Sequence, residues 1–220
     1  MFTGLVQGIG KIRRRSRGLL IENCESLGPL TLGDSIAVDG VCLTVAEIVP
    51  NGFLADVSEE TLRRTTLGLK ADALACVNLE PALRLSDRMG GHIVSGHIDG
   101  LGKVVEIVSN PQSVHLEVMW QESSYGRYVC DKASICLNGI SLTVAASISN
   151  GSRFSIAVIP HTWTNTSLKV LKEGDLVNLE ADLMAKYAES LLSAMFEETN
   201  IKSSAHPLIS KEWLANQGWV

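Results

Sequence analysis

The sequence lacks the long hydrophobic runs and the leader that membrane-bound or exported proteins carry. No window of its 220 residues approaches the roughly 18 apolar residues of a membrane-spanning helix. The N-terminus, MFTGLVQG, has no charged region followed by an apolar stretch, so it does not read as a signal peptide. We therefore expect no membrane partner.

Cysteine is scarce and shows no pairing pattern. The five cysteines are odd in number, irregularly spaced and without a CxxC pair: Cys24, Cys42, Cys76, Cys130 and Cys136. This usage is typical of free thiols in a reducing compartment and not of a disulfide scaffold or a zinc site. We predict a cytoplasmic protein without a metal centre.

An excess of positive charge is also missing. The sequence has 19 Lys and Arg against 24 Asp and Glu, for a formal net charge of −5 at pH 7. This balance argues against nucleic acid as the main partner. The one basic run, residues 11–17, has no basic equivalent later in the chain, and we interpret it as a solvated strand face or loop.

What the sequence does contain is an internal repeat. Residues 35–46 read SIAVDGVCLTVA, and residues 134–145 read SICLNGISLTVA. Residues 4–11 similarly match 96–103, and residues 77–80 match 177–180. Two copies of this length predict two similar domains, over residues 1–88 and 89–183, followed by a tail at 184–220 without a counterpart.

Both copies are predicted to be β-rich. Short β-branched stretches flank Asp39-Gly40 and Asn138-Gly139, which are strong hairpin signals. Turn signals every 8–12 residues favour a small closed barrel. Short helices are expected after Ser58, as an N-cap, and at residues 160–164.

The tail carries the only extended helical period of the sequence. Apolar residues recur there at three and four positions: Met184, Tyr187, Ala188, Leu191, Leu192 and Met195. This stripe would either meet other subunits or pack on the chain's own barrels. A second amphipathic stretch, residues 208–213, is weaker.

The exchange of Cys42 for Ser141 is the main chemical difference between the copies. Cys42 is either a small buried hydrophobic residue or a thiol that adds to an electrophilic carbon. Asp182 stands where the first copy has Ala82, and Lys132 precedes the repeated segment. Both are surface charges by default, and both break the symmetry of the repeat near the proposed site.

Histidine offers a second candidate for chemistry. His97 lies between small residues that permit close backbone approach, and it could transfer a proton or satisfy a loop carbonyl. His92 lies five residues earlier. That spacing suits neither a helix face nor one strand face, so a metal-binding pair is not expected.

Four ordered motifs carry a family resemblance: MFTGLVQG, SIAVDGVCLTV, GGHIVSGHIDG and SICLNGISLTV. Together with the duplication they resemble riboflavin synthase of the α-subunit type, over about residues 1–200. The resemblance implies an all-β fold of two tandem six-stranded Greek-key barrels followed by a C-terminal helix. It also implies a homotrimer whose active sites lie between the N-terminal barrel of one subunit and the C-terminal barrel of the next.

The same resemblance implies a transferase that needs no cofactor. Two molecules of 6,7-dimethyl-8-ribityllumazine would meet in each site, and one would pass a four-carbon unit to the other. The products would be riboflavin and 5-amino-6-ribitylaminouracil. Association with lumazine synthase is left open. The alternative is a non-catalytic lumazine- or flavin-binding antenna protein of the same fold.

By resemblance, the residues placed for chemistry are Cys42, His97, Ser141 and Asp182. The N-barrel site would be lined by Gly4, Leu5, Val6, Cys42, Leu43, Thr44, Asp56, Val57, Ser58, Glu59, Glu60 and Thr61. The C-barrel site would be lined by Gly96, His97, Ile98, Lys132, Ser141, Leu142, Thr143, Ala157, Val158, Ile159, Pro160, His161 and Thr162.

One site would stabilise a carbanion at the C7 methyl of its lumazine, with His97 or Ser141 assisting proton transfer. The other would activate its lumazine by addition of Cys42 or water at C7. The sequence does not decide which barrel does which.

Overall fold

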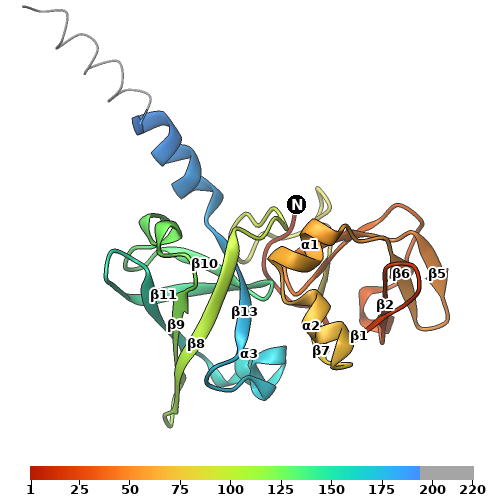
Figure 1. The fold of residues 1–220 in the computed structure, drawn as a ribbon, viewed down its shortest axis with the longest axis horizontal. Coiled ribbons are helices and arrows are strands. Elements are labelled where there is room, and N and C mark those ends of the chain that lie inside the picture. The colour runs from red at the N-terminus through yellow and green to blue at the C-terminus, as the bar shows by residue number, and fades with distance from the viewer. Residues whose placement is uncertain (194–220) are drawn as a thin grey trace, which may run out of the picture. The chain divides into compact units, whose positions relative to one another are not determined.

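The computed structural model describes residues 1–193, and strands dominate this part of the chain (Figure 1). The first copy contains β1 (Gly8–Arg14), β2 (Leu19–Glu22), η1 (Glu25–Leu27), β3 (Ser35–Val38), β4 (Val41–Thr44), β5 (Glu47–Val49), β6 (Gly52–Ala55), α1 (Glu59–Arg64), α2 (Leu67–Asp72) and β7 (Cys76–Pro81). The second contains β8 (Gly100–Ser109), β9 (Val114–Trp120), η2 (Ser123–Tyr128), β10 (Ser134–Leu137), β11 (Ile140–Ile148), β12 (Arg153–Val158), α3 (Pro160–Thr164), η3 (Ser167–Val170) and β13 (Leu176–Ala181).

The second copy is a closed six-stranded barrel in the order β10-β11-β12-β9-β8-β13. The first copy has the same pairings in a seven-stranded sheet, in the order β4-β3-β7-β1-β2-β6-β5. Its extra strand arises because β4 and β5 together take the place of the single strand β11. In β11 this point is marked by a register shift between Val144 and Ala146. The predicted pair of tandem β-barrels is confirmed, with one strand of the first divided in two.

The two hairpins predicted from the repeat are present. Asp39-Gly40 joins β3 to β4, with φ of 45° and 81°, and Asn138-Gly139 joins β10 to β11, with φ of 46° and 77°. Positive φ at both central residues is the type I′ turn, whose twist suits paired strands. The predicted helices are also present, because Ser58 caps α1 and α3 spans Pro160–Thr164.

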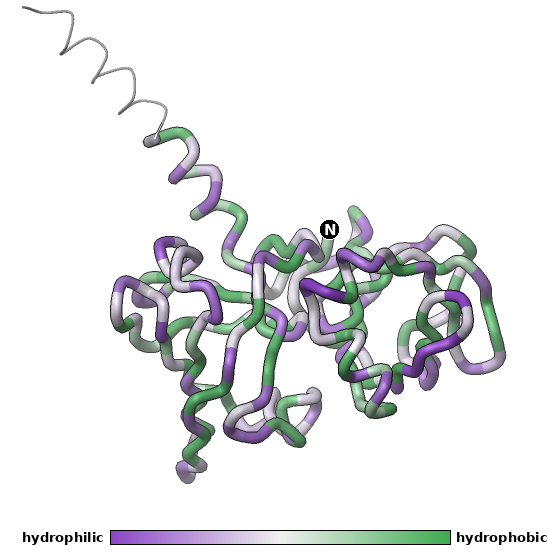
Figure 2. The backbone as a smooth tube through the Cα atoms, in the orientation of Figure 1, coloured by the Kyte–Doolittle hydropathy of each residue, from purple (hydrophilic) through white to green (hydrophobic). Residues whose placement is uncertain are grey.

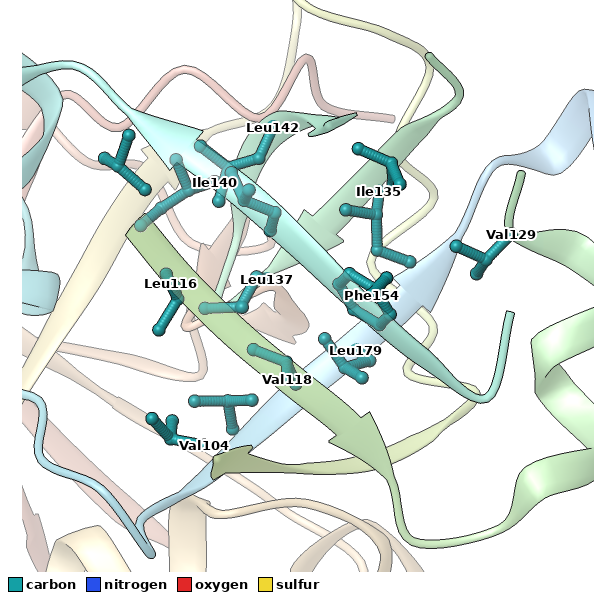
Figure 3. Packing of buried hydrophobic residues seen from close by; sticks show 14 of the residues in the cluster. Val104, Leu116, Val118, Val129, Ile135, Leu137, Ile140, Leu142, Phe154 and Leu179 are labelled. Atoms are coloured by element: carbon teal, nitrogen blue, oxygen red, sulfur yellow. The ribbon is translucent and has the colours of Figure 1, made fainter. Parts of the chain in front are cut away.

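Each copy has its own hydrophobic core, built from the inward-facing residues of its strands. Phe154 lies centrally in the second core, near Val118, Leu137 and Leu179 (Figure 3). Phe53 is the matching buried residue of the first core. Hydrophobic and hydrophilic segments mix along both copies, as period-two alternation produces (Figure 2). Full burial of each such side chain stabilises the fold by about 1.5–3 kcal/mol.

The two copies meet at their hairpin turns, where Gly40 lies against Gly139. A Cβ on Gly40 would be 2.8 Å from the backbone nitrogen of Gly139, and a Cβ on Gly139 would be 2.7 Å from that of Gly40. There is no room for a side chain at either place. The glycines that make the turns possible therefore also permit the contact between the copies.

Two matched asparagines strengthen this contact. The Asn78 amide donates to the Asn138 carbonyl at 2.8 Å and to Ser167 Oγ at 2.9 Å. The Asn178 amide donates to the Asp39 carbonyl at 2.9 Å. Each asparagine thus bonds across to the other copy, and both are almost fully buried. The contact has approximate twofold symmetry.

The tail begins with a helix over residues 183–193. Four residues of the predicted apolar period lie on this helix, and all of them are exposed: Met184, Tyr187, Leu191 and Leu192. Met195 and residues 208–213, which the sequence also singled out, lie outside the described residues.

Within residues 1–193, no helix is both long and apolar enough to span a membrane. The basic run of the sequence lies on β1 and the loop after it. Three of its arginines form ion pairs with Glu22, Asp72 and Asp56, as expected of a solvated strand face.

Candidate functional site

Cys42 and Ser141 occupy equivalent places on the outer faces of their barrels. Cys42 is half-buried on β4, and Thr44 on the same face is exposed. Leu43 between them points into the core, as period-two alternation requires. Ser141, Leu142 and Thr143 repeat the arrangement on β11. The two leucines can therefore offer a ligand only their backbone groups.

A glycine from the other copy packs directly on each of these residues. The Cys42 N–H donates to the Gly96 carbonyl at 2.9 Å, and the Ser141 N–H donates to the Gly4 carbonyl at 2.8 Å. A Cβ on Gly96 would lie 2.6 Å from Cys42 Cβ, and a Cβ on Gly4 would lie 2.6 Å from Ser141 Cβ. The entry segments of the two copies are thus exchanged.

Side-chain packing confirms the exchange. Val6, from the first copy, packs against the core of the second barrel, and Ile98 packs against the core of the first. The resemblance grouped residues 4–6 with Cys42, and residues 96–98 with Ser141, as linings of the two ligand sites. The structure places residues 4–6 with the Ser141 hairpin and residues 96–98 with the Cys42 hairpin.

Two buried glutamates hold the exchanged segments in place. Glu80, on β7, accepts hydrogen bonds from the Thr3 N–H and hydroxyl at 2.7 Å and from the Gly4 N–H at 3.0 Å. Burial raises the pKa of Glu80, and the hydrogen bonds from Thr3 and Gly4 oppose that rise. Glu180 accepts the same set from Ser95 and Gly96.

Ser141 has polar neighbours. Its hydroxyl lies 2.7 Å from Nδ1 of His92, and Gly91 lies close enough that an added Cβ would be 3.0 Å from Ser141 Cβ. Burial lowers the pKa of His92, and the charge of Asp182 partly opposes this. The imidazole is therefore neutral near pH 7 and can accept a proton. His92 Nε2 is buried without a hydrogen-bond partner among residues 1–193.

Cys42 has apolar neighbours instead. It packs against a small buried cluster of Phe2, Ala37, Val94 and Cys136, as Ala82 also does. Phe2 and Val94 hold each other through a short bridge of backbone hydrogen bonds at 2.8 and 3.0 Å. Ala82 takes the position that Asp182 has in the second copy. The two otherwise equivalent hairpins thus present a thiol in apolar surroundings and a hydroxyl beside a base.

The remaining predicted residues lie on loops, or where β6 and β12 lead into α1 and α3. His97 follows Gly96 and so lies by the Cys42 hairpin, where it is exposed. Lys132 is exposed before β10, and its N–H donates to the Val144 carbonyl at 2.9 Å. Residues 56–61 run from the end of β6 into the first turn of α1, and residues 157–162 run from the end of β12 into α3. The Asp56 carboxylate is held by a bidentate pair with Arg17.

His92 and the two glutamates were missed by the sequence reading. The spacing of His92 and His97 predicts only that they form no metal pair, and His92 has no matched residue in the first copy. A signal existed for the glutamates. Val-Asn-Leu-Glu occurs in both copies, and an ionisable residue within a repeated apolar strand needs a buried partner.

A group of potential metal ligands lies elsewhere, where Glu106, His115 and Glu117 of β8 and β9 place one ligand atom each within 4.8 Å of the others. Arg153 already pairs with the Glu117 carboxylate. This cluster shares no residue with the hairpin sites.

The two tandem barrels, with their matched hairpins, make up a duplicated β-barrel protein. The family model for the lumazine binding domain matches the chain twice, over residues 3–82 and 95–182. A solved structure described as LumP complexed with riboflavin has the same fold, with a TM-score of 0.73 over 82% of this chain and 99% of that one, at 24% identity.

Sequence identity to curated relatives shows which family within this class the chain belongs to. The chain is 43% identical to a riboflavin synthase of Actinobacillus pleuropneumoniae, over 87% of this chain and 90% of the relative. It is 43% identical to that of Mycobacterium tuberculosis (strain ATCC 25618 / H37Rv), over 87% and 98%. It is 36% identical to that of Schizosaccharomyces pombe, over 93% and 100%. The chain belongs to the riboflavin synthase family.

Proposed function

We propose that the chain is a riboflavin synthase, a transferase that converts two molecules of 6,7-dimethyl-8-ribityllumazine into riboflavin and 5-amino-6-ribitylaminouracil. The observation that carries the proposal is the pair of matched hairpins, one with Cys42 and one with Ser141, each completed by a glycine of the other copy. A reaction that consumes two copies of one compound needs two similar binding sites. A duplicated scaffold provides them.

Holding the two lumazines in a reactive arrangement lowers the barrier. Intramolecular-like positioning is worth up to about 7–11 kcal/mol in well-oriented cases. The hairpin faces supply thiol and hydroxyl side chains for the edge of a flat heterocycle, through Cys42 and Thr44 on one and Ser141 and Thr143 on the other. No cofactor is required in this proposal.

The two sites carry out different steps of the reaction. The Ser141 hydroxyl and the neutral His92 imidazole form a pair that removes a proton from the C7 methyl of one lumazine. The resulting anion is spread over the conjugated ring. The Cys42 thiol, in its apolar cluster, adds to C7 of the other lumazine and leaves again once the four-carbon unit has been transferred.

His97 and Asp182 keep supporting roles in this proposal. His97 lies by the Cys42 hairpin, so it serves the lumazine of that site and not the Ser141 pair. Asp182 keeps the pKa of His92 from falling further. Residues 56–61 and 157–162 line the two ligand sites.

The working assembly is proposed to be a homotrimer, in which Cys42 of one subunit faces Ser141 of a neighbour. The exposed apolar residues of helix 183–193 provide the surface for such contacts. Residues 1–88 and 89–183 would then be the two lumazine-binding domains, and residues 184–220 the trimerisation helix and tail. The proposed location is the cytoplasm.

A non-catalytic lumazine- or flavin-binding protein is the second candidate, because LumP structures share the fold. The Ser141–His92 pair favours the enzyme, since a protein that only binds its ligand has no use for a base beside a hydroxyl. The higher identity to riboflavin synthases points the same way.

The test is incubation of the full chain with the lumazine alone. Appearance of riboflavin absorbance and fluorescence, with one riboflavin formed for every two lumazines consumed, supports the proposal. Stable binding of the lumazine without new product would support the antenna protein instead.

A further inference from the structure

The two copies differ a second time at their contact, in a way that involves charge. Asp39 of the first turn corresponds to Asn138 of the second, and Lys70 corresponds to Leu171 through the match of residues 65–67 with 166–168. Lys70 Nζ lies 2.5 Å from Asp39 Oδ2. The first copy therefore has an ion pair where the second copy has two uncharged residues.

The ion pair is deeply placed. The Asp39 side chain has no exposed surface, and only 18% of the Lys70 side chain is exposed. The Asp39 carboxylate also accepts the Asn78 N–H at 2.8 Å. In the second copy the Asn138 oxygen accepts the Asn178 N–H at 2.8 Å, whereas Asn138 Nδ2 has no partner among the described residues.

Asp39 opens the turn from which the Cys42 strand departs. Gly40 follows it and lies against Gly139, and Cys42 comes two residues later with its N–H on the Gly96 carbonyl. A shift of the turn would therefore move Cys42 relative to Gly96. It would also press on the turn that leads to Ser141.

We propose that Lys70 is a positioning residue for the Cys42 site, because its ammonium neutralises the buried Asp39 carboxylate and so fixes the turn that carries Cys42. This inference rests on the proposed function. Lys70 touches neither lumazine, and it acts through Asp39 and the hairpin.

The surroundings of Asp39 make its carboxylate strongly dependent on Lys70 for compensation of its charge. The groups that face its side chain are Lys70 from α2 and the Asn78 N–H from β7, while Asn178 from β13 holds its carbonyl. Lys70 is the only charged group in this set. Burial raises the pKa of Asp39, and Lys70 lowers it. Without Lys70 the carboxylate would be a buried, uncompensated charge above its pKa.

The decisive experiment compares Lys70→Met with the double variant Asp39→Asn/Lys70→Leu, which writes the second copy's pair into the first. Leu171→Met is the matched control at the equivalent place. Riboflavin formation is measured from about pH 5.5 to 9. Lys70→Met is expected to lower kcat/KM about tenfold or more, since misplacement of about 1 Å can cost a hundredfold.

The pH profile separates positioning from a loss of folding. In Lys70→Met the rate should fall, relative to the unaltered protein, as pH rises through the pKa of Asp39. The double variant has no titrating group there, so its profile should regain the unaltered shape and its rate should return to within about threefold. Lys70→Arg should keep most of the rate. An unchanged Lys70→Met profile, or a double variant as impaired as Lys70→Met, would overturn the proposal.

A second measurement keeps this inference separate from the proposed function. The rate at which iodoacetamide alkylates Cys42, followed by peptide mass spectrometry, reports the geometry of the site without turnover. If the unaltered chain forms no riboflavin, the proposed function fails, and the alkylation rate still decides the role of Lys70. An alkylation rate equal in all variants would refute it. If Lys70→Met does not fold, the double variant and Lys70→Arg carry the test.

Discussion

The neighbourhoods of Cys42 and Ser141 share a backbone and differ in chemistry. Both residues follow a type I′ turn, receive a glycine carbonyl from the other copy and depend on a buried glutamate at the end of a matched strand. Around this common frame, the second copy has His92 and Asp182 where the first has apolar contacts. The backbone geometry is thus repeated in the two copies, and the side chains around it differ.

The sharpest way to break the comparison is to remove the base. His92→Gln should lower kcat about 10²- to 10⁴-fold, the range for loss of general acid–base assistance. Lumazine binding, followed by ligand fluorescence, should change little. His97→Gln is the matched control on the Cys42 side. If His97→Gln costs more than His92→Gln, the assignment of the proton transfer to the Ser141 site is wrong.

The shared frame can be tested at its two glycines. Gly96→Ala and Gly4→Ala each bring a Cβ within 2.6 Å of the neighbouring Cβ, so turnover should fall about a hundredfold in both. Unfolding should also become easier by about 1–3 kcal/mol, measured by urea titration. Gly33→Ala is the control, because Gly33 has a similar φ of 89° and open space around its Cβ position.

That control isolates steric contact from backbone strain. Gly33→Ala should cost stability through its left-handed φ and leave turnover nearly unaltered. Equal losses of turnover at Gly33 and Gly96 would show that the close approach to Cys42 is unimportant. A loss of turnover in Gly96→Ala but not in Gly4→Ala would mean that the backbone around Cys42 and the backbone around Ser141 do not contribute equally to turnover.

The thiol itself is tested by Cys42→Ser and Cys42→Ala. Cys42→Ser makes the first hairpin resemble the second, and we expect about a tenfold fall in turnover, since a hydroxyl is a weaker nucleophile without an adjacent base. Cys42→Ala should fall further. Wild-type turnover in both variants would mean that Cys42 has no chemical role and that the difference from Ser141 is one of packing.

The smallest expected effect concerns pH. Because the neutral imidazole is the working form and burial lowers the pKa of His92, the rate should fall only as pH drops below the usual histidine value of about 6.5. Asp182 raises that pKa, so Asp182→Asn should lower it and move the acidic limb of kcat to lower pH. The rate at pH 8 should stay within about threefold. A much larger loss at pH 8 would make Asp182 a participant in the chemistry.

Local features of this fold could be predicted from the sequence, because their causes are local. The Asp39-Gly40 and Asn138-Gly139 turns need only positive φ at two adjacent residues, and Ser58 needs only the free N–H of Thr61 at 3.1 Å to cap its helix. The equivalence of Cys42 and Ser141 could also be predicted, because aligning the two copies of the repeat is enough to find it.

The exchange of Gly4 and Gly96 between copies could not be predicted. The two segments match each other, so a repeat places each of them equally well on either barrel, and only packing selects one. His92 escaped because its role depends on Ser141, which is close in space and distant in sequence. A sequence pattern finds residues that share an element more readily than residues that share a site.

The exchange also affects how the protein can form during synthesis. Phe2, Thr3 and Gly4 are synthesised before the rest of the first barrel, yet their partners include Val94 and Ser141, which are made much later. The first barrel can close its core early and can hold the leading segment through Glu80, but the contacts of that segment with Val94 and Ser141 must wait for the second copy. Such contacts between distant parts of a chain form slowly. The step that completes the Ser141 site is therefore among the last in folding, and an unpaired leading segment is exposed to wrong partners until then.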